Sequence, residues 1–175
     1  MPPVSYMYAL PHVLYTRHHI RRYGFHGTSH LYVHGRAAAR SRHAGELKVI
    51  TAHLGNGSSV AAVRGGRSLD TSMGMTPLEG LVMGTRCGDL DPQVVLHVMD
   101  KEELTSAQTS TMMNKHAGLQ GISGLSGDMR DLLAAEAKDD QRAKLAVDMF
   151  CYRLRKYIGA YAAALWALGL LDQLA

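Results

Sequence analysis

The chain has 175 residues, of which 46% are hydrophobic and 19% are charged, and its formal net charge is +4 at pH 7. That length allows one domain with a real core and is short for two, and the composition excludes a disordered chain. The most apolar stretch, residues 157–171, is interrupted by two glycines and is short for a membrane span. A buried core helix is therefore expected there, and no membrane role.

Two cysteines, Cys87 and Cys151, lie far apart in the sequence without a partner at zinc or redox-motif spacing, which favours a reduced, cytoplasmic setting. The N-terminal residues lack the basic and apolar regions of a signal peptide, in agreement with that location. The basic segment Arg17 to Arg22 is interpreted as a solvated helix end and not as a nucleic-acid surface, because no matching basic patch or aromatic platform recurs.

The first half of the chain contains all the strands that the sequence predicts. A helix is expected over residues 4–17, with Pro11 near an element end, followed by a connecting stretch and a second helix over residues 29–42. Three short segments predict strands, the last two joined in a hairpin by a glycine turn: residues 47–52, 60–63 and 68–71.

The second half is predicted to be helical. It follows a loop-rich stretch that ends at Asp91, a candidate N-cap for a helix that starts at Pro92. Further helices are expected over residues 102–115, 128–138 and 141–171, with a glycine-rich loop over residues 118–127. Strands followed by helices indicate an α/β or α+β domain. Because the pattern starts and stops abruptly, we expect this domain to be incomplete at both ends.

A loop of Gly, Asn and Ser, from His53 to Ser59, follows the first predicted strand. Such a loop turns tightly and directs its N–H groups at an anion, most commonly a phosphate. It lacks the lysine of a Walker A loop, and Val60 stands where a dinucleotide fingerprint requires glycine. Two interpretations stay open, a phosphate-binding loop and an ordinary hairpin corner.

His26 lies at a predicted loop-to-helix junction, four residues before His30. This place suits a hydrogen-bond donor to an anion near a helix N-terminus. A structural histidine with satisfied hydrogen bonds is the alternative. Zinc binding by the pair is a third interpretation, against which stands the lack of an evident third ligand.

Arg86 lies between two glycines on a predicted loop, where its planar guanidinium can meet phosphoryl oxygens. It is a candidate for charge stabilisation in phosphoryl transfer, with a salt bridge to Asp89 or Asp91 as the alternative. Asp128 can cap its helix, accept from the hydroxyls of a nucleotide sugar, or do both.

Four segments in this order resemble the acetate kinase family, within the superfamily of acetate and sugar kinases, heat-shock proteins and actin. They are Arg22–His30, His53–Ser59, Thr76–Pro92 and Gly118–Leu132. The resemblance covers nearly the whole chain. It implies a ribonuclease H-like α/β domain and reversible transfer of the γ-phosphate of ATP to a small carboxylate, acetate, giving acetyl phosphate and ADP.

Carried over by position, the resemblance implies that His26 and Arg86 stabilise the transition state. It implies that residues 53–57 form a loop that binds the phosphates of the nucleotide, and that residues 128–130 lie near the nucleoside. These residues are His53, Leu54, Gly55, Asn56, Gly57, Asp128, Met129 and Arg130. Mg²⁺ is expected to accompany ATP or ADP, with its ligands outside this chain.

The resemblance further implies that residues 1–175 are one partial domain, the C-terminal nucleotide-binding domain of a cytoplasmic, homodimeric kinase. Such a fragment is expected to be inactive alone. Two alternatives stay open: a propionate or butyrate kinase of the same family, and a non-catalytic remnant that binds nucleotide or another subunit.

Overall fold

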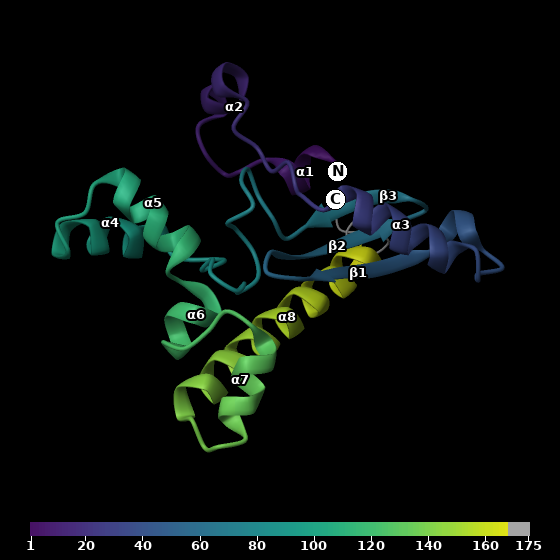
Figure 1. The fold of residues 1–175 in the computed structure, drawn as a ribbon. Helices are drawn as coiled ribbons and strands as arrows, with labels where there is room; N and C mark the ends of the chain where they lie inside the picture. The colour runs from purple at the N-terminus through teal and green to yellow at the C-terminus, as the bar shows by residue number, and fades with distance from the viewer. Residues whose placement is uncertain (168–175) are drawn as a thin grey trace. The chain divides into compact units, whose positions relative to one another are not determined.

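The computed structural model describes residues 1–167, which form two compact units (Figure 1). The first unit comprises Met1–His53, Ser59–Pro77 and the described residues from Arg155 onward. The second comprises Leu54–Ser58 and Leu78–Leu154. That residues 1–175 belong to one nucleotide-binding domain stays a prediction.

The first unit holds a three-stranded sheet of β1 (Lys48–Leu54), β2 (Ser58–Arg64) and β3 (Arg67–Thr71), in that order. β2 and β3 are antiparallel and joined by Gly65 and Gly66, whose φ angles of 53° and 78° favour glycine. Ala61 lies opposite Thr71, and a register shift beyond Ala62 leaves Leu69 without a partner on β2. The predicted hairpin is confirmed.

β2 is buried from Ser58 to Val63, on both of its faces. Ser59 meets helix α3 (Gly27–Ala38) on one face through a hydrogen bond to His30. Val60, which points the other way, is fully buried too. A strand covered on both faces carries a continuous run of small and β-branched residues in place of an alternation, as this one does.

The N-terminal segment forms two short helices where the sequence predicted one. They are α1 (Pro3–Tyr6) and α2 (His12–His18), separated around Pro11, whose ring is incompatible with a helix interior. α3 begins two residues before and ends four residues before the predicted helix, and a 3₁₀ turn, η1 (Ala44–Glu46), leads into β1.

The basic segment behind α2 is a helix end, as predicted, but its last arginine is part of the fold. The Arg22 guanidinium donates to the carbonyls of Thr71 and Ser72 at 2.9 and 3.1 Å, where β3 ends. Arg21 lies with its guanidinium carbon 3.9 Å from the ring centroid of Tyr6. These contacts explain two of the basic residues without an external partner.

The second unit is helical, with α4 (Pro92–Lys101), α5 (Ser106–Lys115), α6 (Gly118–Ser123), α7 (Met129–Glu136) and the first half of α8 (Gln141–Ala167). Asp91 caps α4 by accepting from Gln93 N, as predicted. α5 starts four residues later than predicted, because Thr105 and Gln108 form a capping box there. The core contains Val82, Leu119, Leu132, Ala143 and Ala146.

The predicted glycine loop over residues 118–127 is wrong in its first half, which forms α6. The N–H groups of Leu119 and Gln120 donate to the carbonyls of Met83 and Gly84 at 2.8 and 2.9 Å. These tertiary hydrogen bonds fix a short helix whose glycines oppose helix formation. Gly124, with φ 70°, then ends it in the left-handed conformation.

α8 contributes residues to both units, and residues 168–171 of its predicted range lie outside the described chain. The end of α8 was expected to be buried, but only one side of the helix is. Tyr161 and Leu165 are buried, whereas Ile158 and Trp166 are 43% and 74% exposed. Among residues 1–167, no helix is both long and apolar enough to cross a membrane.

Candidate functional site

Three histidines of the first unit form a cluster around the start of α3. His26 is the N-cap residue of α3, and its φ of 61° is unusual for a residue with a side chain. Its Nδ1 lies 2.9 Å from Ser59 Oγ on β2, and this contact helps to hold the strained junction. The predicted loop-to-helix position of His26 is confirmed.

Gly24 allows the chain to reach this junction. Its φ is 77°, and an added Cβ would lie 2.5 Å from Thr71 Cγ2. Its N–H donates to Gly74 O at 3.2 Å. Only glycine fits both the conformation and the space, which accounts for its place two residues before His26.

His30 is buried beneath α3, with both ring nitrogens bonded. Nδ1 lies 2.8 Å from Thr51 Oγ1, and Nε2 lies 2.8 Å from Ser59 Oγ. Burial, followed by the charges of His26 and His53, lowers the pKa of His30 from 6.5 to about 4. His30 is therefore neutral at physiological pH.

His53, at the end of β1, completes the cluster. Its ring stacks on that of His26, with centroids 4.0 Å apart, and its Nδ1 lies 3.0 Å from Ser29 Oγ. Nδ1 of each of the three histidines lies within hydrogen-bond distance of a hydroxyl oxygen. Within residues 1–167 no group of three or more His, Cys, Asp or Glu side chains could hold a metal ion, so the zinc interpretation of His26 and His30 has no support.

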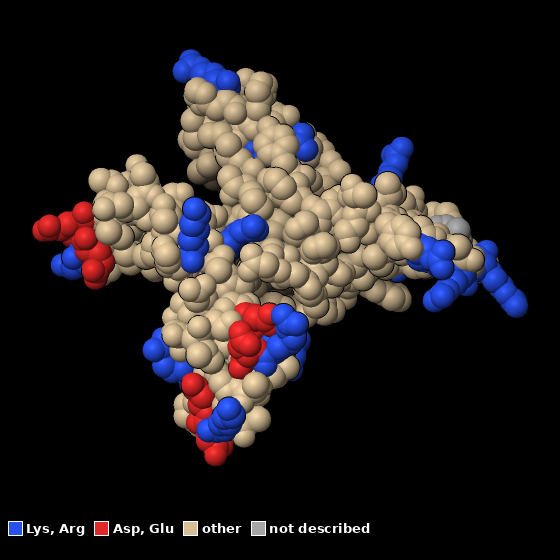
Figure 2. Space-filling model, viewed as in Figure 1, with Lys and Arg blue, Asp and Glu red and all other residues tan. Residues whose placement is uncertain are grey.

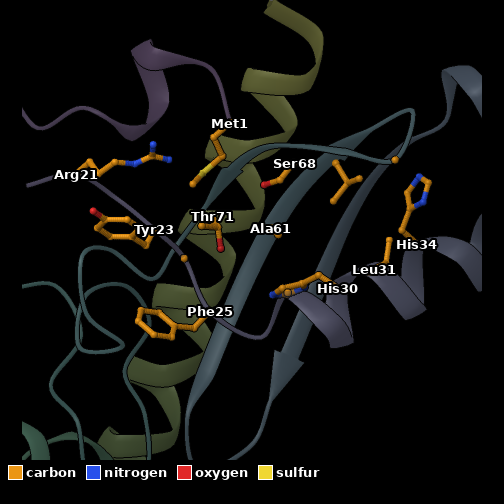
Figure 3. Close-up of a pocket in the computed structure, with 14 residues that line it drawn as sticks. Met1, Arg21, Tyr23, Phe25, His30, Leu31, His34, Ala61, Ser68 and Thr71 are labelled. Carbon is orange, nitrogen blue, oxygen red and sulfur yellow. The ribbon is translucent and has the colours of Figure 1, made fainter. Parts of the chain in front are cut away.

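A cavity of about 340 Å³ runs along β2 beneath α3 (Figure 3). Phe25 and Tyr23 lie at one end and His34 at the other, with Ala61 between them. Val63 also lines the cavity. His34 is 7% exposed, and its Nε2 is buried with no hydrogen-bond partner among the described residues. This unpaired nitrogen is a local cost to stability.

The glycine loop of the second unit, Gly55 to Gly57, joins β1 to β2. Gly55 N donates to Gly57 O at 3.2 Å, and Ser58 Oγ donates to Gly55 O at 2.9 Å. The N–H groups of Asn56 and Gly57 have no acceptor among the described residues. Successive N–H groups in a tight turn form a concave site for an anion.

The Arg86 guanidinium lies against this loop. A Cβ added to Gly57 would be 3.0 Å from Arg86 Nη1, so the glycine gives the guanidinium its room. Nη1 also donates to Met83 Sδ at 3.6 Å, and the backbone of Arg86 accepts from Met83 N. The loop and the guanidinium therefore lie next to each other, and both carry N–H donors of the kind that bind phosphate oxygens.

Asp89 and Asp91, the carboxylates considered as partners of Arg86, have other contacts. Asp89 accepts from Gly80 N at 2.8 Å and pairs with Arg153 at 3.1 Å. Asp91 caps α4. The cysteine beside Arg86, Cys87, has a pKa that burial raises, so it is a poor nucleophile, and it is a free thiol, as is Cys151.

A cleft of about 800 Å³ lies beside the glycine loop, within the second unit. Six residues that the sequence assigned to nucleotide binding line it: Leu54, Gly55, Asn56, Asp128, Met129 and Arg130. Two others do not: Gly57 lies under Arg86, and His53 belongs to the histidine cluster. Segments more than seventy positions apart thus meet in one cleft, which a plain hairpin corner does not require.

Five lining residues were missed by the sequence analysis: Thr85, Leu119, Gln120, Gly127 and Phe150. Gly127 is required by the structure, because an added Cβ would lie 2.8 Å from Gly84 O. Thr85 and Leu119 lie inside Thr76–Pro92 and Gly118–Leu132, two of the segments that carry the family resemblance. Phe150 enters from α8, and no local motif marks it.

Asp128 and Arg130 form an ion pair at the edge of the cleft. Asp128 caps α7, accepting from Arg130 N at 2.9 Å and from Arg130 Nε at 3.0 Å. Hydrogen bonds from Arg130 lower the pKa of Asp128 to about 2. The capping interpretation is confirmed, and the carboxylate is ionised at neutral pH.

On the face shown in Figure 2, acidic side chains gather at the end of α4 and over α7, whereas Lys and Arg side chains occur on several elements. At the edge of the cleft, Asp128 and Arg130 supply one charge of each sign.

Comparison with known proteins decides the family. The model of the acetokinase family matches residues 1–174. The chain belongs to the acetokinase family. It is 59% identical over 169 residues to the acetate kinase of Syntrophobacter fumaroxidans, and 57% identical over 166 residues to that of Methanosarcina thermophila. Each match covers 94% of this chain but only 40% and 41% of the relative, so the chain spans about two fifths of their length.

Solved structures of the acetokinase family show the same fold. The chain is similar to the Porphyromonas gingivalis acetate kinase (TM-score 0.91, 49% identity) and to a Francisella tularensis propionate kinase (TM-score 0.88, 44% identity). Both matches cover 94% of this chain and 42% of the other. The predicted α/β, ribonuclease H-like fold is confirmed.

Proposed function

We propose that this chain is the nucleotide-binding part of an acetate kinase, which transfers the γ-phosphoryl group of ATP reversibly to acetate, forming acetyl phosphate and ADP. The observation that carries the proposal is the cleft of the second unit, which Gly55, Asn56 and the start of α7 line, with the Arg86 guanidinium against the adjoining Gly57. Relatives more than 55% identical bear the name acetate kinase, which supports the choice of acceptor.

In this proposal the N–H groups of Asn56 and Gly57 bind the phosphate chain of the nucleotide. The Arg86 guanidinium stabilises charge on the transferring phosphoryl group. Phosphoryl transfer passes through a loose transition state, which needs fixed donors and positive charge more than an acid–base pair. Asp128 and Arg130 lie where the nucleoside would extend along the cleft, with the ionised carboxylate as an acceptor for hydroxyl groups.

His26 is proposed as a further stabiliser of the transition state, donating a hydrogen bond to a phosphoryl oxygen. Its support is its fixed place at the N-terminus of α3 and the bonding of Nδ1 to Ser59. Mg²⁺ supplies charge neutralisation to bound ATP in kinases. The described residues do not provide a group of ligands for it, so none of these roles passes through the metal.

A homodimer, a cytoplasmic location and the absence of a nucleic-acid partner are parts of the same proposal. The free thiols of Cys87 and Cys151 agree with a reducing compartment. Propionate and butyrate are the competing acceptors, and a solved propionate kinase is a structural relative. A non-catalytic nucleotide-binding protein is the second candidate function, since the chain spans two fifths of its relatives.

The experiment is a chimaera in which this chain replaces the matching segment of the Methanosarcina thermophila acetate kinase. Acetyl phosphate formation is measured with acetate, propionate and butyrate as acceptors. We expect activity that is highest with acetate. A folded chimaera that binds ATP without transferring phosphate would instead favour the non-catalytic candidate.

Arg86→Ala in the chimaera should lower kcat by about a thousandfold or more, because charge on the phosphoryl group loses its guanidinium. KM for ATP should change little. Arg142→Ala is the matched control, since that guanidinium bonds carbonyls of α6 at 2.8 to 3.3 Å and lies outside the cleft lining. An unchanged kcat in Arg86→Ala would refute the proposed role.

A further inference from the structure

The hydroxyl of Ser59 lies between two imidazole rings. Its oxygen is 2.9 Å from His26 Nδ1 and 2.8 Å from His30 Nε2. Ser59 is fully buried and its hydroxyl has one proton, so the hydroxyl donates to one of these nitrogens and accepts the N–H of the other. The proton positions on the two rings are therefore linked through Ser59.

A second hydroxyl decides which way the protons point. Thr51 Oγ1 lies 2.8 Å from His30 Nδ1 and 3.5 Å from Ala61 O. Thr51 is 2% exposed and His30 7%, so the Thr51 proton needs a partner within the protein. The shorter contact is a sound hydrogen bond, and the longer is at the limit of one. Thr51 therefore donates to His30 Nδ1.

The remaining protons follow in order. His30 is neutral because its pKa is lowered to about 4, so with Nδ1 accepting, its single ring proton is on Nε2. Nε2–H donates to Ser59 Oγ, and the Ser59 proton is then directed at His26 Nδ1. In the reverse order the Thr51 oxygen would accept from His30 Nδ1, and the buried Thr51 proton would have Ala61 O at 3.5 Å as its acceptor.

We propose that Thr51, His30 and Ser59 are positioning residues that fix the ring tautomer of His26, with Nδ1 accepting a hydrogen bond and the proton on Nε2. A ring held in this form offers a neutral N–H donor suited to an anionic oxygen. Its use in phosphoryl transfer rests on the proposed function, whereas the tautomer itself does not.

The test is ¹⁵N NMR of the ring nitrogens, in the whole chain labelled at histidine and without nucleotide, near neutral pH. We expect His26 and His30 both to carry the proton on Nε2. Their Nδ1 signals should be shifted from that of an unbonded ring nitrogen, because each accepts a hydrogen bond. The wild-type spectrum alone can overturn the proposal: a His26 proton on Nδ1 would do so.

Substitutions test each link. Ser59→Ala should move the His26 Nδ1 signal toward the unbonded value, and Ser59→Thr, which keeps the hydroxyl, should restore it. Ser29→Ala is the matched control, because it removes the partner of His53 Nδ1 and should shift the His53 signals alone. A His26 Nδ1 signal unchanged by Ser59→Ala, in a variant with a native amide spectrum, would refute the proposed positioning of His26 by Ser59.

These results separate the proposed tautomer of His26 from the proposed function. Ring signals are read without ATP, so a wrong tautomer counts against the proposed positioning of His26 alone. Failure to bind nucleotide counts against the proposed function alone.

Discussion

Two histidines one turn apart on α3, His30 and His34, line the same cavity and differ in their hydrogen bonds. Both nitrogens of His30 are bonded at 2.8 Å, whereas His34 Nε2 is buried without a partner in the described chain. Each unpaired buried polar group costs about 1–3 kcal/mol, so the two positions should respond to substitution in opposite directions.

His34→Leu is expected to raise the free energy of unfolding by about 1 kcal/mol, because it replaces the unpaired nitrogen by an apolar side chain beside a cavity that can accommodate it. His30→Leu, its matched control, should lower that free energy by about 1–3 kcal/mol, since it strands two buried hydroxyl groups. Urea unfolding measures both. Equal losses at the two positions would mean that His34 Nε2 has a partner, such as a water.

His30 also predicts how stability depends on pH. The unfolded chain binds a proton at this residue below about pH 6.5, and the folded chain only below about pH 4. The free energy of unfolding should therefore fall as pH is lowered through this window, by an amount on the order of 2–3 kcal/mol, and this contribution should be constant outside it.

The measurement is urea unfolding of the wild type and His30→Gln between about pH 7.5 and about pH 3, a range that brackets the unfolded and folded pKa values of His30. The difference between the two proteins isolates His30 from the other histidines. A wild-type slope that survives unchanged in His30→Gln would assign the dependence elsewhere.

At the scale of single residues, the sequence predicts local features better than it predicts contacts between distant segments. The junction position of His26 and the caps at Asp91 and Asp128 follow from local chemistry, and the structure confirms them. The Ser59 bridge between two histidines does not, because α3 and β2 meet only in the folded chain. Phe150 was missed for the same reason.

At the scale of elements, α7 is held by one deeply buried side chain. Leu132 is fully buried in the core of the second unit, and its neighbour Leu133 is 50% exposed. Leu132→Ala should lower the free energy of unfolding by about 2–5 kcal/mol through lost burial and the cavity left behind.

Leu133→Ala is the matched control, with the same change on the same helix, and should cost less than about 0.5 kcal/mol. Thermal or urea unfolding followed by circular dichroism compares the two. Similar losses would show that α7 packs through a different face from the one described.

The strands were predicted from local pattern because their hairpin has a glycine turn and short, regular segments. α6 was not, because its two glycines oppose a helix and its stabilising hydrogen bonds go to the carbonyls of Met83 and Gly84, 36 positions earlier. The apolar half of α8 was predicted to be buried, yet Ile158 and Trp166 are exposed. Hydrophobic content alone does not determine which face a neighbouring element covers.

At the scale of the whole molecule, membership of the acetokinase family and the kinase fold are established, while catalysis, acceptor and assembly are proposals. The chain spans about two fifths of its relatives. Within that span, we propose that the glycine loop and the start of α7, which line the cleft of the second unit, bind a nucleotide beside Arg86.

The central claim is that the glycine loop binds the phosphates of ATP. Its most direct test is an ATP titration of the ¹⁵N-labelled chain, followed through the backbone amide signals of Gly55, Asn56 and Gly57. We expect saturable shifts of these signals, with a Kd of about 1 mM or tighter, and much smaller shifts with adenosine, which lacks phosphate. ATP that leaves these three signals unchanged, or adenosine that moves them equally, would contradict it.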